Sequence, residues 1–326
     1  MNSSSIPLPT PEGLASVSGA PNLPAGFTKT FKSRFVDTGE LRLHAVIGGE
    51  GPPLLLVHGW PETWYAWRLL MPALARDFQV IAVDQRGMGL SDKPEAGYDT
   101  GTLARDLVAL MDALGHRRFA LVGHDTGFAI GYALAAVHPD RVDRAVLAEI
   151  PGPPGAAPSP PLFVPAPLND RLWHLPFNRL EKLNEQLVTG REEIFFGWEF
   201  EAAAKKLPRE VISYYVRILS NPDSLRGSFG FYRALDTTIA QNERRKTKLT
   251  IPVLAIGGAA SFGEHVAQAM KLVADDVQGL VIPATGHFVA EESPADMLAA
   301  LTAFLAPYRA VPAGSHPRAA DGAAVR

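Results

Sequence analysis

The sequence predicts an α/β fold, in which a mostly parallel sheet is covered by helices on both faces and interrupted by a helical insertion. Three observations lead to this prediction. Short apolar segments alternate with helical patterns in both parts of the chain, a proline-rich stretch breaks the alternation, and a wholly helical region follows the break. Near-continuous apolar strands between helices are typical of parallel sheets that are buried on both faces.

The first half of the chain shows the alternation most clearly. Its helical segments carry apolar residues three or four positions apart, as Leu103, Leu107 and Leu110 do, whereas its strand segments are continuously apolar. We therefore expect strands at residues 41–47, 53–58, 78–83, 119–123 and 142–149, with helices at residues 63–75, 101–114 and 127–138.

Eight prolines between residues 151 and 167 end this pattern, because proline cannot continue a central strand or a helix interior. The next segment, from about residue 170 to residue 243, has a helical pattern throughout. Strands at residues 252–257 and 279–282 and a helix at 294–306 then complete the alternation. The expected organisation is a core of residues 26–150 and 248–309, a helical cap at 151–247, and flexible ends at 1–25 and 310–326.

The composition is that of a globular protein, since 47% of the 326 residues are hydrophobic and 20% are charged. Lys and Arg number 31 against 34 Asp and Glu, so no overall basic field would attract nucleic acid or anionic lipid. The sequence has no cysteine, which excludes disulfides, thiolate metal sites and thiol nucleophiles. No apolar run reaches transmembrane length and no secretory leader is visible, so we expect a cytoplasmic protein; a secreted or periplasmic form with its leader removed is the alternative.

A turn of the form Gly-x-Asp-x-Gly is made by Gly123, Asp125 and Gly127 between an apolar strand and a helix of small residues. This context is that of a nucleophile elbow, in which the glycines let strand and helix approach closely around a strained nucleophile. Here aspartate occupies the position that serine usually takes. The alternative is that Asp125 only caps the helix that follows it.

A second turn is expected to meet this aspartate. His58, Gly59, Trp60 and Pro61 follow an apolar strand, and a turn there can aim the backbone N–H of Trp60 at the same point as that of Thr126. Two N–H groups that converge in this way form an oxyanion hole. A cis peptide bond before Pro61 would suit the turn.

The third turn contains His287, which follows the last expected strand, so the nucleophile comes first in the chain and the histidine last. The histidine needs an acid partner for its other ring nitrogen. Glu149 closes a strand whose end should converge on the same edge of the sheet, and we prefer it to Glu264.

An aspartate nucleophile predicts a different reaction from a serine. A carboxylate that attacks a saturated carbon leaves an ester, and water can then attack the carboxyl carbon of the aspartate itself. Aspartate is ionised at neutral pH, so His287 is free to activate that water in the second step. Epoxides and alkyl halides are the two substrate classes that fit.

Residues 24–308 resemble the α/β-hydrolase-fold epoxide hydrolases, and most of all their bacterial Cif-type branch. The motifs that carry the resemblance are HGWPETWYAWRLLMPALA, GHDTG, the strand-end Glu149, LWH, FYRAL and the final GH. The resemblance implies a mostly parallel eight-stranded sheet with helices on both faces and an inserted cap. It also implies that two cap residues, His174 and Tyr232, polarise the epoxide oxygen, whereas most epoxide hydrolases use two tyrosines. Tyr214 and Tyr215 are the alternative donors.

The expected reaction is therefore the hydrolysis of an epoxide to a vicinal diol. It requires a small epoxide and water, and no cofactor, metal ion, nucleic acid or membrane. A homodimer is an open alternative to a monomer.

Two other functions are compatible with the same turns. Dehalogenases use the same nucleophile, but Trp60, Thr126 and Leu175 occupy positions that complete the halide or carboxylate sites of the haloalkane and haloacetate enzymes. A non-catalytic relative with this fold is the remaining alternative, since fold alone does not prove activity. The presence of both Asp125 and His287 argues against it.

Overall fold

A single sheet forms the centre of the computed structural model, which describes residues 8–156, 161 and 163–309. Within these residues the sheet has eight strands in the order β1-β2-β4-β3-β5-β6-β7-β8. The pairs β1–β2 and β2–β4 are antiparallel and the other pairs are parallel, so the predicted mostly parallel sheet is confirmed. The strands are β1 (Lys32–Asp37), β2 (Arg42–Gly48), β3 (Pro53–Val57), β4 (Gln79–Val83), β5 (Phe119–His124), β6 (Val142–Ala148), β7 (Val253–Gly258) and β8 (Val277–Ile282).

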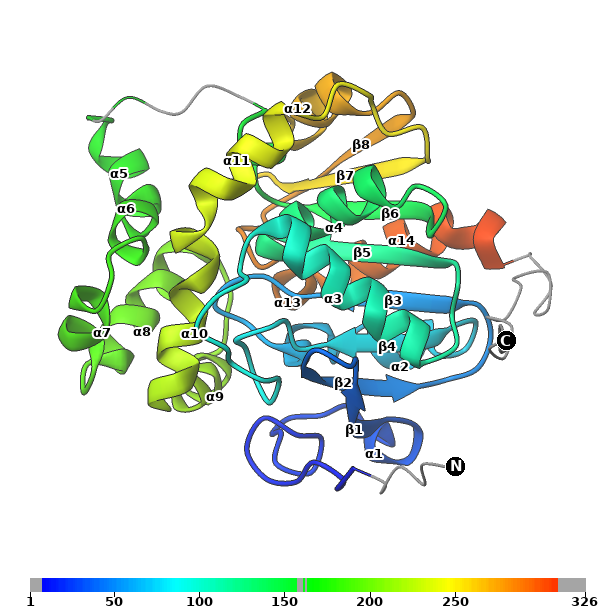
Figure 1. The fold of residues 1–326 in the computed structure, drawn as a ribbon, viewed down its shortest axis with the longest axis horizontal. Helices are drawn as coiled ribbons and strands as arrows, with labels where there is room; N and C mark the ends of the chain where they lie inside the picture. The colour runs from blue at the N-terminus through cyan, green and yellow to red at the C-terminus, as the bar shows by residue number, and fades with distance from the viewer. Residues whose placement is uncertain (1–7, 157–160, 162, 310–326) are drawn as a thin grey trace, which may run out of the picture.

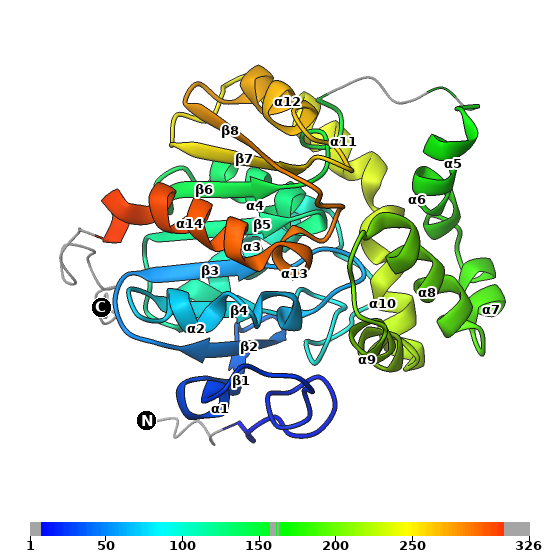
Figure 2. The same ribbon diagram turned by 180° about the vertical axis from the view of Figure 1, so that it is seen from behind.

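Helices cover both faces of the sheet, because the side chains of its central strands alternate between two apolar cores. In β3, Leu55 and Val57 belong to one core, and Leu54 and Leu56 belong to the other. Figure 1 shows the first face, which is covered by α3 (Thr100–Ala113), α4 (Thr126–Val137) and α12 (His265–Val273). Figure 2 shows the other face, with α2 (Met71–Leu74), α13 (Val289–Glu292) and α14 (Pro294–Arg309).

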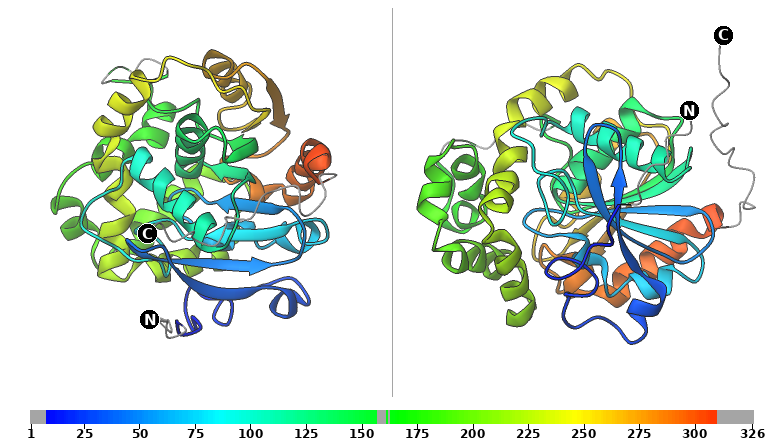
Figure 3. Two further views of the ribbon diagram at one scale, coloured as in Figure 1. Left: turned by 45° about the vertical axis from the view of Figure 1, so that its right-hand side comes forward. Right: turned by 60° about the horizontal axis from the view of Figure 1, so that its bottom comes forward.

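The predicted insertion is helical and lies between β6 and β7 in the chain. In Figures 1 and 3 it stands to one side of the sheet, at the edge where the parallel strands end. Its helices are α5 (Ala166–Leu172), α6 (His174–Asn178), α7 (Leu183–Val188), α8 (Glu192–Ala203), α9 (Arg209–Leu219), α10 (Pro222–Arg233) and α11 (Leu235–Glu243). We call these seven helices the cap.

Some elements differ from the expected ones. The helix expected at 63–75 is split into a 3-10 helix, η1 (Trp64–Trp67), and the short α2, because Pro72, the second residue of α2, has no N–H to continue a helix from η1. Strand β1 and helices α1 (Phe27–Thr30), α12 and α13 were not expected. Within the described residues, no helix combines the length and the apolar character needed to cross a membrane.

The expected flexible N-terminal segment needs a correction at residues 15–17, which are buried. The indole N–H of Trp64 donates to the carbonyl oxygen of Ala15 at 2.7 Å, and the amide of Val17 donates to Oγ of Ser33 at 2.9 Å. Composition failed here because these contacts use backbone groups that any residue supplies. Residues 1–7 and the tail 310–326 lie outside the described residues.

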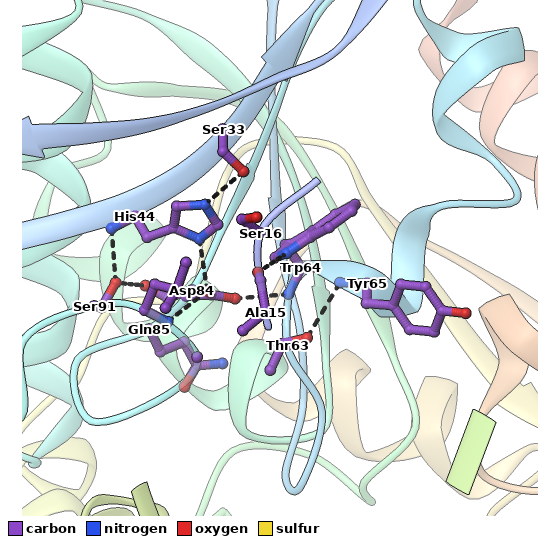
Figure 4. Close-up of polar contacts among 12 residues, drawn as sticks. Ala15, Ser16, Ser33, His44, Thr63, Trp64, Tyr65, Asp84, Gln85 and Ser91 are labelled. Atoms are coloured by element: carbon purple, nitrogen blue, oxygen red, sulfur yellow. Dashed lines mark hydrogen bonds and ion pairs between the residues drawn. The ribbon is translucent and has the colours of Figure 1, made fainter. Parts of the chain in front are cut away.

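A buried polar network connects this segment to η1 (Figure 4). Nδ1 of His44 lies 2.7 Å from Oδ2 of Asp84, and Nε2 lies 3.0 Å from Oγ of Ser33. Oδ1 of Asp84 accepts a hydrogen bond from the amide of Trp64 at 2.8 Å. Burial would raise the pKa of Asp84, but the adjacent His44 keeps it below its usual value. The charged Asp84 therefore holds η1, which directly follows the turn at His58–Pro61.

Candidate active site

The turn after β5 has the geometry of a nucleophile elbow. Asp125 has a φ of 52°, a strained conformation for a residue other than glycine. A Cβ at Gly123 would lie 2.3 Å from the carbonyl oxygen of Gly127, and a Cβ at Gly127 would lie 2.2 Å from that of Val57. Both positions therefore require glycine. The Asp125 side chain makes no capping hydrogen bond to α4, which argues against the capping alternative.

The turn after β3 places a backbone donor on this aspartate. The Trp60–Pro61 peptide bond is cis, and the amide of Trp60 donates to Oδ1 of Asp125 at 2.8 Å. Gly59 packs so closely that a Cβ there would lie 2.5 Å from Cβ of Asp125. Thr126 is the first residue of α4, where helix N–H groups have no partner within the helix. Two donors are thus available where the oxyanion hole is predicted.

His58 supports this turn and does not line the cavity described below. Its ring is fully buried, and Nδ1 bonds to the carbonyl oxygen of Gly59 at 2.8 Å. The amide of Gln85 donates to the other ring nitrogen at 3.2 Å. Burial lowers the pKa of His58, so a neutral ring that donates from one nitrogen and accepts at the other fits both contacts.

His287 lies between two carboxylates. Its Nε2 is 3.6 Å from Oδ2 of Asp125, and its Nδ1 is 3.1 Å from Oε2 of Glu149. Glu149 is buried, and its other oxygen accepts a hydrogen bond from the amide of Gly258 at 2.5 Å. Glu264 is exposed at the start of α12. The fold therefore brings Glu149, and not Glu264, to the histidine.

The charges of the site favour an ionised nucleophile. Burial would raise the pKa of Asp125, but the hydrogen bond and charge of His287, together with the Trp60 amide, hold it at about 2. Burial would lower the pKa of His287, but its contacts with Asp125 and Glu149 raise it well above its usual value. The resting site thus stabilises a carboxylate beside a protonated imidazole.

The cap contributes two polar groups to the opposite wall. The ring of His174 stacks on Trp60 with centroids 5.1 Å apart, and the ring of Tyr232 meets Trp60 edge-on at 5.4 Å. Burial, followed by the charges of Asp125 and Glu199, raises the pKa of Tyr232 well above its usual value, so its hydroxyl keeps its proton.

Neither alternative tyrosine lines the cavity. Tyr215 donates to Oε1 of Glu291 at 2.7 Å, away from the nucleophile. Tyr214 is buried and packs on Tyr65, with ring centroids 4.6 Å apart. The predicted pair of His174 and Tyr232 is therefore the one that faces the cavity.

Asp125 and His287 from the core, and His174 and Tyr232 from the cap, line a cavity of about 470 Å³. Its walls are mainly apolar and include Ile150, Leu172, Leu175, Phe231, Leu235, Ile239, Phe262 and Phe288. Such a cavity suits a small, largely apolar ligand. Among the described residues, no group of three or more His, Cys, Asp or Glu side chains is arranged to hold a metal ion.

Sequence reasoning missed two residues of the site. Nδ1 of His124 lies 3.0 Å from Oε2 of Glu62, and its Nε2 lies 2.8 Å from the carbonyl oxygen of His287. Burial would lower the pKa of His124, but Glu62 raises it above its usual value, and the charge of His124 lowers the pKa of Asp125. His124 lies inside the GHDTG motif, which was the available signal.

Glu199 is the second missed residue. It lies on α8, is buried, and has Oε2 3.2 Å from Nδ1 of His174. No spacing pattern marks it in the sequence, because its neighbours in the site come from distant parts of the chain.

Comparisons with known proteins agree with this architecture. Residues 52–294 match the family described as alpha/beta hydrolase fold. The chain is 35% identical to a soluble epoxide hydrolase of Corynebacterium sp. (strain C12), over 82% of this chain and 95% of that protein. It is 32% identical to a fluoroacetate dehalogenase of Burkholderia sp., over 86% and 95% respectively.

A solved structure shows the same likeness. The crystal structure of wild-type Cfl2 from Burkholderia cenocepacia superimposes with a TM-score of 0.80 at 35% identity, and the match covers 84% of this chain and 96% of that one. The resemblance stated from the motifs is thereby confirmed. The chain belongs to the α/β hydrolase-fold family, in the group of sequences that includes the epoxide hydrolases.

Proposed function

We propose that the protein is an epoxide hydrolase that works through an ester on Asp125. The observation that carries the proposal is the division of labour between the two carboxylate oxygens. Oδ1 accepts the hydrogen bond of the Trp60 amide, whereas Oδ2 is the oxygen nearest to His287. This division supports a role for Oδ1 as the future ester carbonyl and for Oδ2 as the attacking oxygen.

In the first step, Oδ2 of Asp125 attacks a ring carbon and the carbon–oxygen bond of the epoxide breaks. The ring oxygen gains a proton, because Tyr232 and His174 supply donors on the opposite wall. An alkoxide leaves poorly without such donors. The raised pKa of Tyr232 keeps its proton available until the developing alkoxide takes it up.

Formation of the ester prepares the second step. Esterification removes the negative charge of Asp125, which is one of the groups that raise the pKa of His287. The pKa of His287 therefore falls, so the ring releases its extra proton to solvent and can act as a base. The Tyr232 phenolate regains a proton from solvent, which balances the one it gave to the epoxide oxygen. Glu149 keeps a proton on Nδ1, so Nε2 is the nitrogen that faces water.

Water then gives a proton to His287 and attacks the carboxyl carbon of Asp125. The negative charge that develops on Oδ1 is stabilised by the amides of Trp60 and Thr126. Collapse of this intermediate breaks the ester bond and expels the alkoxide of the diol, which takes the proton of the new Asp125 carboxyl group. The diol leaves, and Asp125 is again a carboxylate beside a protonated His287. The reaction needs only an epoxide and water, since every group comes from one chain.

Isotope labelling tests this mechanism. A single turnover in water enriched in ¹⁸O must place the heavy oxygen in the Asp125 carboxylate, which peptide mass spectrometry detects. The His287→Gln variant should open the epoxide and then accumulate the ester, seen as a rise in intact mass equal to the substrate. If the label appeared only in the diol after one turnover, direct attack of water on the epoxide would replace the proposal.

The dehalogenase relative supplies the second candidate function. The same nucleophile could displace a halide, but Thr126 follows it and Leu175 follows the cap histidine, so neither position holds the residue expected of a haloacetate enzyme. A parallel assay of epoxides, fluoroacetate and haloalkanes separates the candidates. Diol without halide supports the epoxide hydrolase, and halide without diol supports the dehalogenase.

A further inference from the structure

A buried carboxylate in the cap wall of the cavity has no role in the proposed mechanism. Glu199 is 5% exposed and lines the cavity from α8. Oε2 lies 3.2 Å from Nδ1 of His174, but the two atoms form no hydrogen bond. Among the described residues, neither Nδ1 of His174 nor Oε1 of Glu199 has a hydrogen-bond partner. Burying a carboxylate in this position costs free energy. Its negative charge also acts on any charged ligand that enters the cavity.

The charge of Glu199 acts on Tyr232, a residue of the proposed reaction site. It contributes to the raised pKa of Tyr232, the hydroxyl that is proposed to meet the epoxide oxygen. The Asp125 carboxylate contributes in the same direction from the core side. A ligand between them is therefore flanked by two negative groups in a mainly apolar cavity, where charges interact more strongly than in water.

The imidazoles of the inner cavity do not fully offset these negative charges. The carboxylates are those of Asp125, Glu149 and Glu199, and the imidazoles are those of His174 and His287. Three negative charges exceed two positive ones, so the net charge of these five groups is negative even when both rings carry two protons. Glu62 and His124 pair with each other beneath the site and add no net charge.

The mouth of the cavity does not supply the missing cation. Among the described residues that line the cavity, Arg171 is the only Lys or Arg. Its side chain is exposed, and its guanidinium donates to the carbonyl oxygen of Ala260 at 2.7 Å. The neighbouring Asp170 also lines the cavity and opposes its charge.

We infer that the cavity selects epoxides that carry no carboxylate beside the ring, and that Glu199 sets this selectivity. The inference rests on the proposed function, because it concerns the substrates of the same site. It also accounts for a difference in substrate from the fluoroacetate dehalogenase relative, whose named substrate is an anion. Glu199 then rejects anions from its position beside His174, where Oε2 lies 3.2 Å from Nδ1.

The test uses two epoxides of nearly equal shape, glycidamide and glycidate, and measures kcat/KM for diol formation from each. Wild type should prefer glycidamide. The Glu199→Gln variant should reduce the glycidamide-to-glycidate ratio by at least about tenfold, because one of the two flanking charges is removed. The use of a ratio cancels any loss of donor function that affects both substrates equally.

Two matched variants separate charge from packing. Glu199→Asp keeps the charge and should retain most of the wild-type ratio. Glu201→Gln removes an exposed charge from the same helix, outside the cavity, and should leave the ratio unchanged. If Glu199→Gln lowers both values of kcat/KM equally, Glu199 only positions His174 and the inference is wrong.

A measurement on wild type alone covers the case in which Glu199→Gln does not fold. Butyramide should inhibit at least about tenfold more strongly than butyrate, for the same electrostatic reason. Equal inhibition would overturn the inference. Failure of the proposed function is distinguishable, since wild type would then form no diol from glycidamide or from styrene oxide.

Discussion

Replacing Glu149 with glutamine tests the proposed roles of the acid and the base together. The carboxylate is fully buried and contacts His287 at 3.1 Å and the Gly258 amide at 2.5 Å. Glu149 touches no reacting atom in the proposed mechanism. Its loss should therefore slow the hydrolysis of the ester much more than its formation.

The size of the effect follows from these two contacts. A hydrogen bond to a charged group contributes about 1.5–3 kcal/mol, and a loss of about 2 kcal/mol corresponds to a roughly 30-fold slower step. The geometry adds a second cost. The amide oxygen of glutamine would keep the bond from Gly258, so its NH₂ group would face Nδ1 of His287. The ring proton would then move to Nε2, which could no longer accept a proton from water.

We therefore expect ester hydrolysis to slow by at least about 30-fold, and by as much as about 10⁴-fold if the wrong tautomer is fixed completely. Rapid-quench kinetics with intact-mass detection measures the two steps separately. The Glu149→Gln variant should show a burst of ester that persists, while the rate constant for its formation stays close to that of wild type.

Glu264→Gln is the matched control, because it removes the other acid considered for this role, at an exposed position. It should behave like wild type. If Glu149→Gln slowed both steps equally, Glu149 would be supporting the fold of the site rather than the base. If only Glu264→Gln accumulated ester, the assignment of the acid would be reversed.

Three further outcomes are expected from the same geometry. Tyr232→Phe should slow ester formation by about 100-fold, the effect of losing one preorganised donor, and leave ester hydrolysis unchanged; equal slowing of both steps would contradict this role. Because the pKa of Asp125 is held at about 2, the rate constant of ester formation should stay constant from neutral pH down to about pH 4. A fall of this rate constant centred near pH 4 in rapid-quench data would refute the ionised nucleophile. Gly59→Ala should cost about 1–3 kcal/mol in denaturant unfolding, since its Cβ would lie 2.5 Å from Cβ of Asp125; an unchanged midpoint would mean that the turn can shift.

The sequence could predict those parts of the site that require a special backbone. Asp125 adopts a left-handed φ between two segments that nearly touch, and only glycine at positions 123 and 127 permits that approach. Such constraints leave a local pattern of residues. His287 was equally predictable, because its place directly after the last strand fixes which edge of the sheet it occupies.

The remaining parts depend on contacts between distant segments, which leave no local pattern. Glu199 is an ordinary helical glutamate until the cap folds over Trp60 and places His174 beside it. The same reason explains the buried residues Ala15 and Val17 in a segment that composition classed as flexible. Their burial depends on donors in Trp64 and on Ser33, which the segment itself does not reveal.

The division between core and cap explains how one fold can serve several substrates. The core alone supplies the proposed nucleophile, base, acid and oxyanion donors, and His124 ties two of their loops together through Glu62 and the carbonyl oxygen of His287. The cap supplies His174, Tyr232 and Glu199, which line the opposite wall of the cavity, where the proposed mechanism puts the leaving oxygen. Changes in the cap should therefore alter which electrophile is accepted, whereas the ester intermediate should persist as long as the core turns are intact. A cap variant that bypassed the ester would contradict this division.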